Sequence, residues 1–347
     1  MLEEDPLRKK PCTHYGGTLS AGLKITHACD INPSRLRKFA EHASIPRSNC
    51  YTDYQSLITE VKPELVIIAT WTESHARIGI LAAENGTKVI VSEKPVASTL
   101  DDAHALITAC ENNGTSLIIN HERRYDPRYI QVKKLLDSNQ IGEVQTVNAM
   151  VLTGGSNGNA RTEAGGGPLL QDGTHMVDII RYYFGNILSV RGRFNRHMQS
   201  SVFEDRAIAW LRTESGIDIF LEAGGKRDYF HFELQVYGTR GKIVIGNGYQ
   251  HLYMSNKSRY YTGFRDLVEV PFPDFHNENC FTREYNEAAA LLNGDDVNIL
   301  SDGNDGLKAL EIVHAVYLSA YIDSDVQLPL TSASVDLEVI FPIVDAS

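Results

Sequence analysis

The chain has 347 residues, of which 42% are hydrophobic and 22% are charged, and its formal net charge is −11. This composition is typical of a globular protein with a sizeable core, and the length predicts two domains. The acidic balance disfavours nucleic acid and anionic membranes as partners, no apolar run is long enough to cross a bilayer, and the acidic start of the chain is unlike a secretory signal.

Short apolar runs alternate with helical stretches over about the first 120 residues. Predicted strands occupy residues 23–29, 65–70, 88–92 and 116–120, and predicted helices occupy 33–42, 74–85 and 100–112. Strands that alternate with helices of this length indicate βαβ units and a parallel sheet. We therefore predict an α/β domain over residues 1–122.

The pattern changes after residue 122. A strand opens at Ile141 and runs through Val151, a glycine-rich loop covers 157–167, and a strong helix runs from Pro168 to Phe184. Between residues 188 and 270 several strands follow one another without helices, and two late helices are predicted at 282–292 and 306–321. We expect an α+β second domain over residues 123–347 with a large, mainly antiparallel open sheet.

Polar residues follow the first two predicted strands. Asp30 ends the strand at 23–29, where a carboxylate in a dinucleotide-binding unit accepts hydrogen bonds from ribose hydroxyls and repels a 2′-phosphate. The alternative is that Asp30 caps the next helix. After the strand at 65–70, Thr70, Thr72 and His75 offer hydroxyl, imidazole and backbone N–H groups that suit a cofactor's ribose and phosphates, with ordinary helix capping as the alternative.

Ser92-Glu93-Lys94-Pro95 stands at the end of the strand at 88–92. Polar residues at that edge of a parallel sheet face the ligand crevice. Lys94 is expected to hold a substrate hydroxyl there, with its ammonium form disfavoured away from bulk water, and Pro95 permits a cis peptide bond. The alternative is a solvent-facing lysine in a turn.

The predicted helix after Gly165-Gly166-Gly167 carries a polar stripe on an otherwise apolar element. Gln171 and His175 lie four residues apart, so they fall on one face, and Asp172 is three residues from His175. Such a stripe is costly to bury unless it lines a cavity or is hydrogen-bonded. His175 is suited to accept a proton near neutral pH, and the alternative is a satisfied core histidine.

The cysteines and the start of the chain carry no metal signal. Five scattered cysteines form no C-x-x-C pair, which predicts reduced thiols in a cytoplasmic protein. Cys12 and His14 lack partners at zinc-binding spacing, so no metal is expected.

Taken together, these residues resemble the Gfo/Idh/MocA family of oxidoreductases over about residues 13–325. Glu93-Lys94-Pro95 and the stretch from Gly165 to Asp178 carry the resemblance most specifically. It implies a Rossmann-type domain that binds NAD, with NADP less expected because of Asp30, followed by a domain whose open sheet mediates homo-oligomerisation. It also implies a sugar, inositol or related polyol as substrate, Glu93 and Lys94 beside the cofactor, and His175 as general acid/base with Lys94 steadying the alkoxide.

Two departures from the family pattern stand out. The family carries an aspartate four residues before this histidine, where Gln171 stands, so either Gln171 or Asp172 is expected to assist His175. The family also opens with a strand and a G-x-G-x-x-G turn that cradles the pyrophosphate, and residues 1–12 contain neither. We therefore hypothesise that the first domain is incomplete, either because the chain is truncated or because its start is assigned too late.

Two rival interpretations remain open on the sequence alone. One is a catalytically silent protein that binds a nucleotide or sugar on the same fold, which the missing G-x-G-x-x-G turn and Gln171 favour and the pair Lys94 and His175 opposes. The other is a purely structural role for the large sheet.

Overall fold

The chain forms two compact units in the computed structural model, which describes residues 13–154, 166–196, 203–331 and 337–341. Unit 1 contains the chain up to residue 125 and the segment 277–306, and unit 2 contains the rest. The sequence assigned everything after residue 122 to the second domain. The segment 277–306 returns to unit 1 because the apolar face of its helix α8 (Cys280–Leu292) joins the core of that unit.

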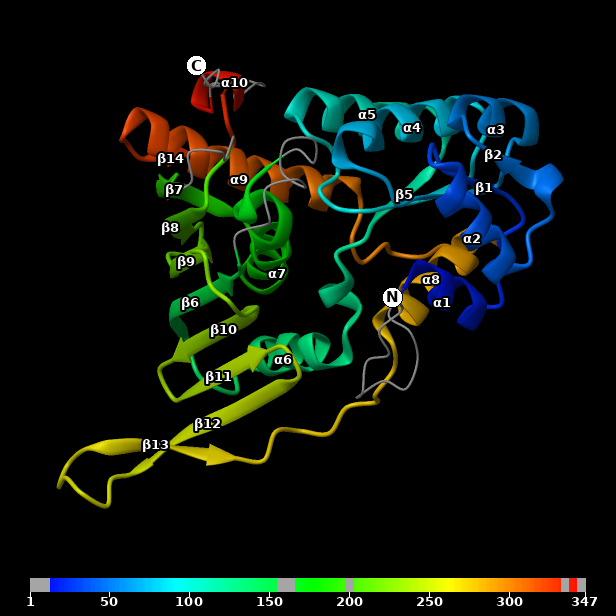
Figure 1. Cartoon of the computed structure of the whole chain (residues 1–347). Helices are drawn as coiled ribbons and strands as arrows, with labels where there is room; N and C mark the ends of the chain where they lie inside the picture. Colours follow the sequence, from blue (N-terminus) through cyan, green and yellow to red (C-terminus); the bar gives the residue numbers. More distant parts are fainter. Residues whose placement is uncertain (1–12, 155–165, 197–202, 332–336, 342–347) are drawn as a thin grey trace. The chain divides into compact units, whose positions relative to one another are not determined.

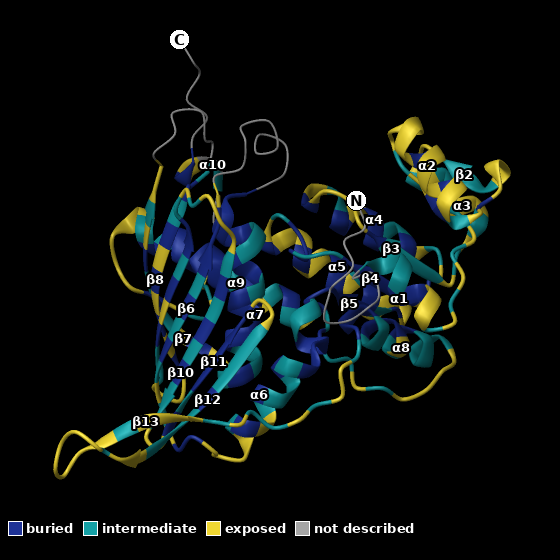
Figure 2. Cartoon of the chain, turned by 60° about the horizontal axis from the view of Figure 1, so that its bottom comes forward, coloured by how far each residue is buried: buried dark blue, intermediate teal, exposed yellow. Residues whose placement is uncertain are grey.

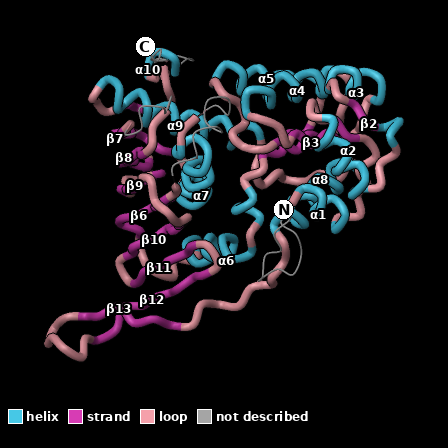
Figure 3. Tube along the Cα trace, viewed as in Figure 1, coloured by secondary structure: helices cyan, strands magenta, loops and turns pink. Residues whose placement is uncertain are grey.

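Unit 1 contains the predicted parallel strands, in two separate sheets (Figures 1 and 3). One sheet has the order β3-β4-β5, and the other pairs β1 with β2. The strands are β1 (Ala28–Cys29), β2 (Cys50–Tyr51), β3 (Leu65–Ile68), β4 (Val89–Ser92) and β5 (Ser116–Ile119). The helices are α1 (His14–Ser20), α2 (Pro33–Ala43), α3 (Tyr54–Val61), α4 (Thr72–Glu84), α5 (Leu100–Asn113) and α8, with short 3-10 turns at Arg47–Asn49 and Glu122–Tyr125.

Helices cover both faces of the β3-β4-β5 sheet, which explains why all four residues of β4 are buried. On one side α4 and α5 approach closely at Gly79, where a β-carbon would meet Leu106 at 2.5 Å. On the other side α1 packs on α8 at Gly17, where a β-carbon would lie 2.8 Å from the carbonyl oxygen of Phe281. The two glycines therefore allow the helices to pack against each other (Figure 3).

Several predicted elements differ in extent from the structure. The strand expected over residues 23–29 is reduced to Ala28–Cys29, and the helix expected from Ser74 already begins at Thr72. Helix α3 and α6 (Pro127–Asp137) were not predicted. Part of the glycine-rich loop, residues 157–165, lies outside the described residues, as do residues 1–12.

Unit 2 is built on one nine-stranded sheet of the order β13-β12-β11-β10-β6-β9-β8-β7-β14. Every pairing is antiparallel except that of β6 with β9, so the predicted mainly antiparallel sheet is confirmed. The strands are β6 (Val144–Leu152), β7 (Ile187–Asn195), β8 (Arg206–Thr213), β9 (Asp218–Gly224), β10 (His231–Gly238), β11 (Gly241–Gly246), β12 (Tyr249–Lys257), β13 (Arg265–Val270) and β14 (Val326–Gln327).

Helices α6, α7 (Thr174–Phe184) and α9 (Gly303–Ile322) lie against one face of this sheet (Figure 1). A π-helical turn at Leu169–Gly173 leads into α7, the first four residues of α9 belong to unit 1, and the short α10 (Leu337–Ile340) follows β14 in the chain. Strand β8 shows the resulting alternation: Ala207, Ala209 and Leu211 are buried, whereas Ile208 and Trp210 are exposed (Figure 2). One face of the sheet is therefore the core, and no described helix covers the other.

Candidate functional site

Three strand ends of unit 1 bring polar residues together. Thr70, Glu93 and Asn120 follow β3, β4 and β5. The backbone N–H of Glu93 donates to the Ile68 carbonyl at 2.8 Å, and that of Asn120 donates to the Ser92 carbonyl at 2.8 Å. Because parallel strands end at a common edge, the two predicted motifs around Thr70 and Lys94 become neighbours.

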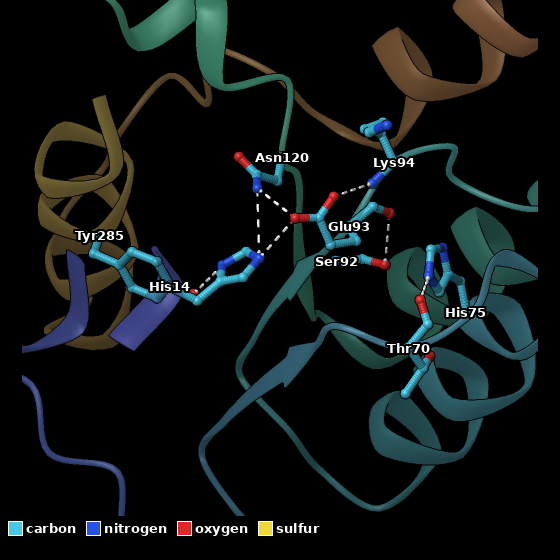
Figure 4. A network of polar contacts seen from close by, with 8 residues as sticks. All are labelled: His14, Thr70, His75, Ser92, Glu93, Lys94, Asn120 and Tyr285. Carbon is cyan, nitrogen blue, oxygen red and sulfur yellow. Dashed lines mark hydrogen bonds and ion pairs between the residues drawn. The ribbon is translucent and has the colours of Figure 1, made fainter. Parts of the chain in front are cut away.

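The Glu93 carboxylate is the centre of a polar network (Figure 4). Its Oε1 atom lies 3.0 Å from His14 Nε2 and accepts a hydrogen bond from Asn120 Nδ2 at 2.9 Å, and its Oε2 accepts the Lys94 backbone N–H at 3.2 Å. His14 Nδ1 lies 2.7 Å from the Tyr285 hydroxyl. Helices α1 and α8 therefore both contribute to the turn that carries Lys94.

This network keeps Glu93 ionised. Burial raises the pKa of the Glu93 carboxyl, but hydrogen bonds from His14 and Asn120 and the positive charges of His14 and Lys94 outweigh it and lower the pKa to about 2. Lys94 acts in the same direction on Glu122, whose pKa is nevertheless raised because burial dominates. Two carboxyl groups thus lie within electrostatic reach of the Lys94 ammonium, and the Lys94–Pro95 bond is cis, as the sequence permits.

His14, Asn120 and Tyr285 were not predicted as site residues. The sequence offers His14 only as a possible metal ligand beside Cys12, and the described residues contain no cluster of three or more metal-binding side chains. The signal for Asn120 was its place after a predicted strand. Nothing local marks Tyr285, which lies 271 residues from His14 in the sequence.

His75 links the two turns rather than facing solvent. It is only 1% exposed, with Nδ1 2.8 Å from the Pro95 carbonyl oxygen and Nε2 3.0 Å from that of Thr70. Both ring nitrogens therefore contact protein carbonyls, and the ring holds the turn after β3 against the cis bond after Lys94 (Figure 4).

The turn between β3 and α4 exposes the side chains of Thr70 and Trp71 to solvent. Thr70 is exposed and accepts a hydrogen bond from Ser74 Oγ at 2.7 Å, whereas Thr72 is buried in the first turn of α4. Trp71 occupies the N-cap position, is 53% exposed and makes no side-chain capping bond. The start of α4 therefore presents backbone N–H groups at the carboxyl edge of the sheet.

Asp30 follows β1, and it is not the cap of the next helix. Asn32 is the N-cap of α2 and accepts the Ser34 N–H at 2.9 Å and the Arg35 N–H at 3.2 Å. Asp30 Oδ1 accepts the Asn32 N–H at 2.7 Å. This leaves Oδ2 of Asp30 without a hydrogen bond to any described residue.

In unit 2, Gln171, Asp172 and His175 are half-buried where the π-turn meets α7. The single helix predicted from Pro168 to Phe184 is therefore interrupted. A turn closed by i→i+5 bonds contains more residues than an α-turn, so residues four apart lie closer to one line. The Gln171 side chain donates from Nε2 to the Gly166 carbonyl at 3.4 Å.

A buried carboxylate fixes the start of that turn. Glu204 is fully buried, and its Oε1 accepts the Leu169 N–H at 2.9 Å and the Tyr317 hydroxyl at 3.0 Å. Gly167 gives it room, because a β-carbon there would lie 2.0 Å from Glu204 Oε2. Lys94 belongs to unit 1 and His175 to unit 2, so each half of the predicted site is held within its own unit.

The chain matches two family models. A model of an oxidoreductase family with an NAD-binding Rossmann fold (GFO_IDH_MocA) matches residues 11–121, and a model of the GFO/IDH/MocA C-terminal domain matches residues 129–244. D-apiose dehydrogenase from Paraburkholderia graminis is 29% identical over 326 residues, which is 88% of this chain and 84% of the relative. The scyllo-inositol 2-dehydrogenase (NAD(+)) of Bacillus subtilis is 28% identical over 270 residues, covering 76% of this chain and 78% of the relative.

Solved structures match the fold. A levoglucosan dehydrogenase in complex with NADH and L-sorbose superposes with a TM-score of 0.78 at 21% identity and covers 92% of this chain and 95% of its own. The WlbA dehydrogenase from Bordetella pertussis in complex with NADH and UDP-GlcNAcA gives 0.77 at 20% identity, with 91% and 95% covered. The described helices include none that is long and apolar enough to cross a membrane.

Proposed function

This chain belongs to the Gfo/Idh/MocA family of NAD-binding oxidoreductases, and we propose that it oxidises a secondary hydroxyl group of a sugar, inositol or related polyol. The observation that carries the proposal is the turn at Glu93–Pro95, where His14 and Asn120, both distant in sequence, bond the Glu93 carboxylate beside Lys94 at the carboxyl edge of the sheet. The curated relatives that act on apiose and inositols support a polyhydroxylated substrate.

The residues present in unit 1 fit a dinucleotide. Asp30 Oδ2 is available to accept ribose hydroxyls, the exposed Thr70 hydroxyl and the open start of α4 suit polar groups of the cofactor, and Lys94 stands at the same edge. Glu93 contributes by anchoring Lys94. Thr72 is buried at the start of α4, and the buried His75 contacts the carbonyl oxygens of Thr70 and Pro95 on either side of the proposed cofactor site.

The reaction divides between cofactor and protein. NAD, when bound, supplies the hydride acceptor. A ring nitrogen of His175 removes the hydroxyl proton, since an imidazole is basic near neutral pH. Lys94 Nζ stabilises the negative charge that develops on the oxygen, and the Gln171 amide orients His175 without sharing its proton.

Turnover of matched variants tests this assignment. NADH formation is followed with a panel of inositols, pentoses and hexoses. Replacing His175 by Asn is expected to lower kcat by about 10²- to 10⁴-fold, and replacing Lys94 by Ala by about 10²- to 10³-fold. Lys88→Ala and His104→Ala are controls. Lys88 lies directly before β4, at the end of the strand opposite to Lys94, and His104 is exposed on α5. Turnover retained in Lys94→Ala or His175→Asn would contradict the site.

Asp30 is the proposed determinant of cofactor choice. Replacing it by Ser removes the carboxylate that repels a 2′-phosphate, so the preference for NAD over NADP should fall. Steady-state rates with both cofactors measure the ratio, and an unchanged ratio would remove Asp30 from the cofactor site.

Self-association and location complete the proposal. The open face of the unit 2 sheet exposes Ile208, Trp210 and Phe220, with the last two rings stacked 6.5 Å apart, and we propose that it pairs with the same face of a second copy. Trp210→Ser/Phe220→Ser should then sediment as a smaller species. The described cysteines are free, which supports action in the reducing cytoplasm.

A further inference from the structure

The β12–β13 hairpin carries an aromatic tip with no described packing partner outside the hairpin. Tyr260, Tyr261 and Phe264, in the loop between the two strands, are 83%, 67% and 70% exposed. Leu267 and Val268 point to opposite faces of β13 and both are exposed, so neither face of that strand packs on a core. The hairpin extends past the rest of the sheet of unit 2 (Figure 1).

The tip has a defined structure although it is exposed. Ser258 Oγ accepts the backbone N–H groups of Tyr260 and Tyr261 at 3.2 and 3.1 Å, and the Ser258 N–H donates to the Phe264 carbonyl at 3.0 Å. The rings of Tyr261 and Phe264 meet edge to face at 6.2 Å. A loop ordered in advance loses less conformational entropy when it binds.

The charge of the tip is opposite to that of the molecule. The tip contains Lys257, Arg259 and Arg265 and one acidic residue, Asp266, which accepts the Arg259 backbone N–H at 3.3 Å, so its net charge is positive, whereas the whole chain carries −11. The Arg265 guanidinium is fixed by Ser255, donating to its Oγ at 2.8 Å and to its carbonyl at 2.9 Å. A cationic, aromatic tip is attracted to a protein of opposite charge, and another copy of this chain carries a net charge of −11.

The area also fits a second copy. Three aromatic side chains exposed to this degree present on the order of 400 Å². Two hairpins related by a two-fold axis, each covering a similar area of the other copy, would bury about 1,600 Å², the size of a standard stable interface.

We propose that the β12–β13 hairpin is an arm that docks its aromatic tip onto a second copy of this chain. This deepens the self-association proposed above by adding a contact outside the open sheet face. The arm also occupies the edge of the sheet, since no described strand pairs with the outer side of β13.

Sedimentation and photo-crosslinking test the arm. Tyr260→Ser/Tyr261→Ser/Phe264→Ser should weaken self-association at least tenfold with an unchanged circular dichroism spectrum, because none of these side chains is in a core. Arg259→Glu/Arg265→Glu should weaken it in low salt, with a smaller effect in high salt. Tyr229→Ser/Phe230→Ser is the matched control, since these exposed aromatic residues lie outside the hairpin.

A photoreactive phenylalanine at position 261 reports the partner directly. In a mixture of isotopically light and heavy chains, light-to-heavy adducts are expected. A monomeric wild-type chain, unchanged association in the triple variant, an equal loss in the control, or adducts within one chain alone would each overturn the arm. Turnover and the Trp210→Ser/Phe220→Ser variant are measured alongside. If the chain oxidises polyols but the tip substitutions leave self-association unchanged, the arm is rejected and the enzymatic proposal stands. If the chain associates through the tip but shows no turnover, the enzymatic proposal is rejected and the arm stands.

Discussion

Glu284 offers the sharpest test of the electrostatics around Glu93. It lies on α8, is fully buried, and neither of its carboxyl oxygens has a hydrogen-bond partner among the described residues. Burial raises the pKa of Glu284 well above its usual 4.5, and the nearby carboxyl groups of Glu93, Glu122 and Glu287 raise it further. Glu284 is therefore expected to be protonated in the folded chain at pH values where the unfolded chain has released that proton.

The sign of the pH dependence follows from this difference. Between pH 4.5 and the raised pKa the folded state binds one more proton than the unfolded state, so the free energy of unfolding falls as pH rises. The cost of keeping Glu284 protonated grows by about 1.4 kcal/mol for each pH unit above the unfolded value of 4.5, until the raised pKa is reached. Glu284→Gln has nearly the same shape and requires no proton, so its stability relative to wild type should rise with pH over that range and differ by almost nothing at pH 4.

Urea titrations and thermal melts at pH 4, 5.5, 7 and 8 measure the effect on wild type and variant. Glu111→Gln, an exposed position on α5, is the control and should show no such divergence with pH. If Glu284→Gln is less stable than wild type at pH 7, the ionised carboxylate must make favourable contacts in the folded state, and the reasoning is wrong.

Three further substitutions test the network around Glu93, the turn fixed by Glu204 and the contact between α4 and α5. Glu93→Gln removes a carboxyl group whose pKa is lowered to about 2. In wild type the ionised group contributes up to about 3 kcal/mol to the free energy of unfolding above pH 4.5, and this contribution is lost as pH falls towards 2. The free energy of unfolding of Glu93→Gln, measured by urea titration, should therefore fall less steeply than that of wild type over this pH range. Gly167→Ala places a β-carbon 2.0 Å from the buried Glu204 carboxylate and should cost about 3 kcal/mol or more in urea unfolding, with a parallel loss of turnover. Gly79→Ala meets only a methyl group of Leu106 at 2.5 Å and should cost less than about 2 kcal/mol, because that side chain can move and alanine favours the helix. Equal losses in the two alanine variants would show that the Glu204 carboxylate does not resist displacement.

The sequence predicted those features that local patterns encode. The apolar runs at 65–68 and 89–92 became parallel strands, although only 89–92 is fully buried and Leu65, Val66 and Ile67 are half-buried at the edge of the sheet, and the alternation in β8 and β9 became an antiparallel pair with one open face. Lys94 was placed at a strand end by the same logic. These assignments succeed because period and burial are properties of a few consecutive residues.

The failures involve contacts between distant residues. His14 gave no signal because its partners Glu93 and Tyr285 are 79 and 271 positions away. The return of α8, which begins at Cys280, to unit 1 depends on packing against strands that end at Ser92 and Ile119, and no local pattern records it. The π-turn at Leu169–Gly173 was read as an ordinary helix because its composition is helical, and the bond pattern differs only in register.

Glu93 and Glu204 show one principle in both units. Glu204 is fully buried and the Glu93 side chain is 28% exposed, and each accepts bonds from groups that meet only in the folded chain: His14 and Asn120 in one case, Leu169 N–H and Tyr317 in the other. A carboxylate can accept several hydrogen bonds at once, so one side chain can fix several elements. The segments fixed in this way are those that carry Lys94 and His175. The positions of Lys94 and His175 therefore depend on the carboxylates of Glu93 and Glu204, which need not touch the substrate. Because these carboxylates contact residues distant in sequence, their role was harder to predict than the roles of Lys94 and His175.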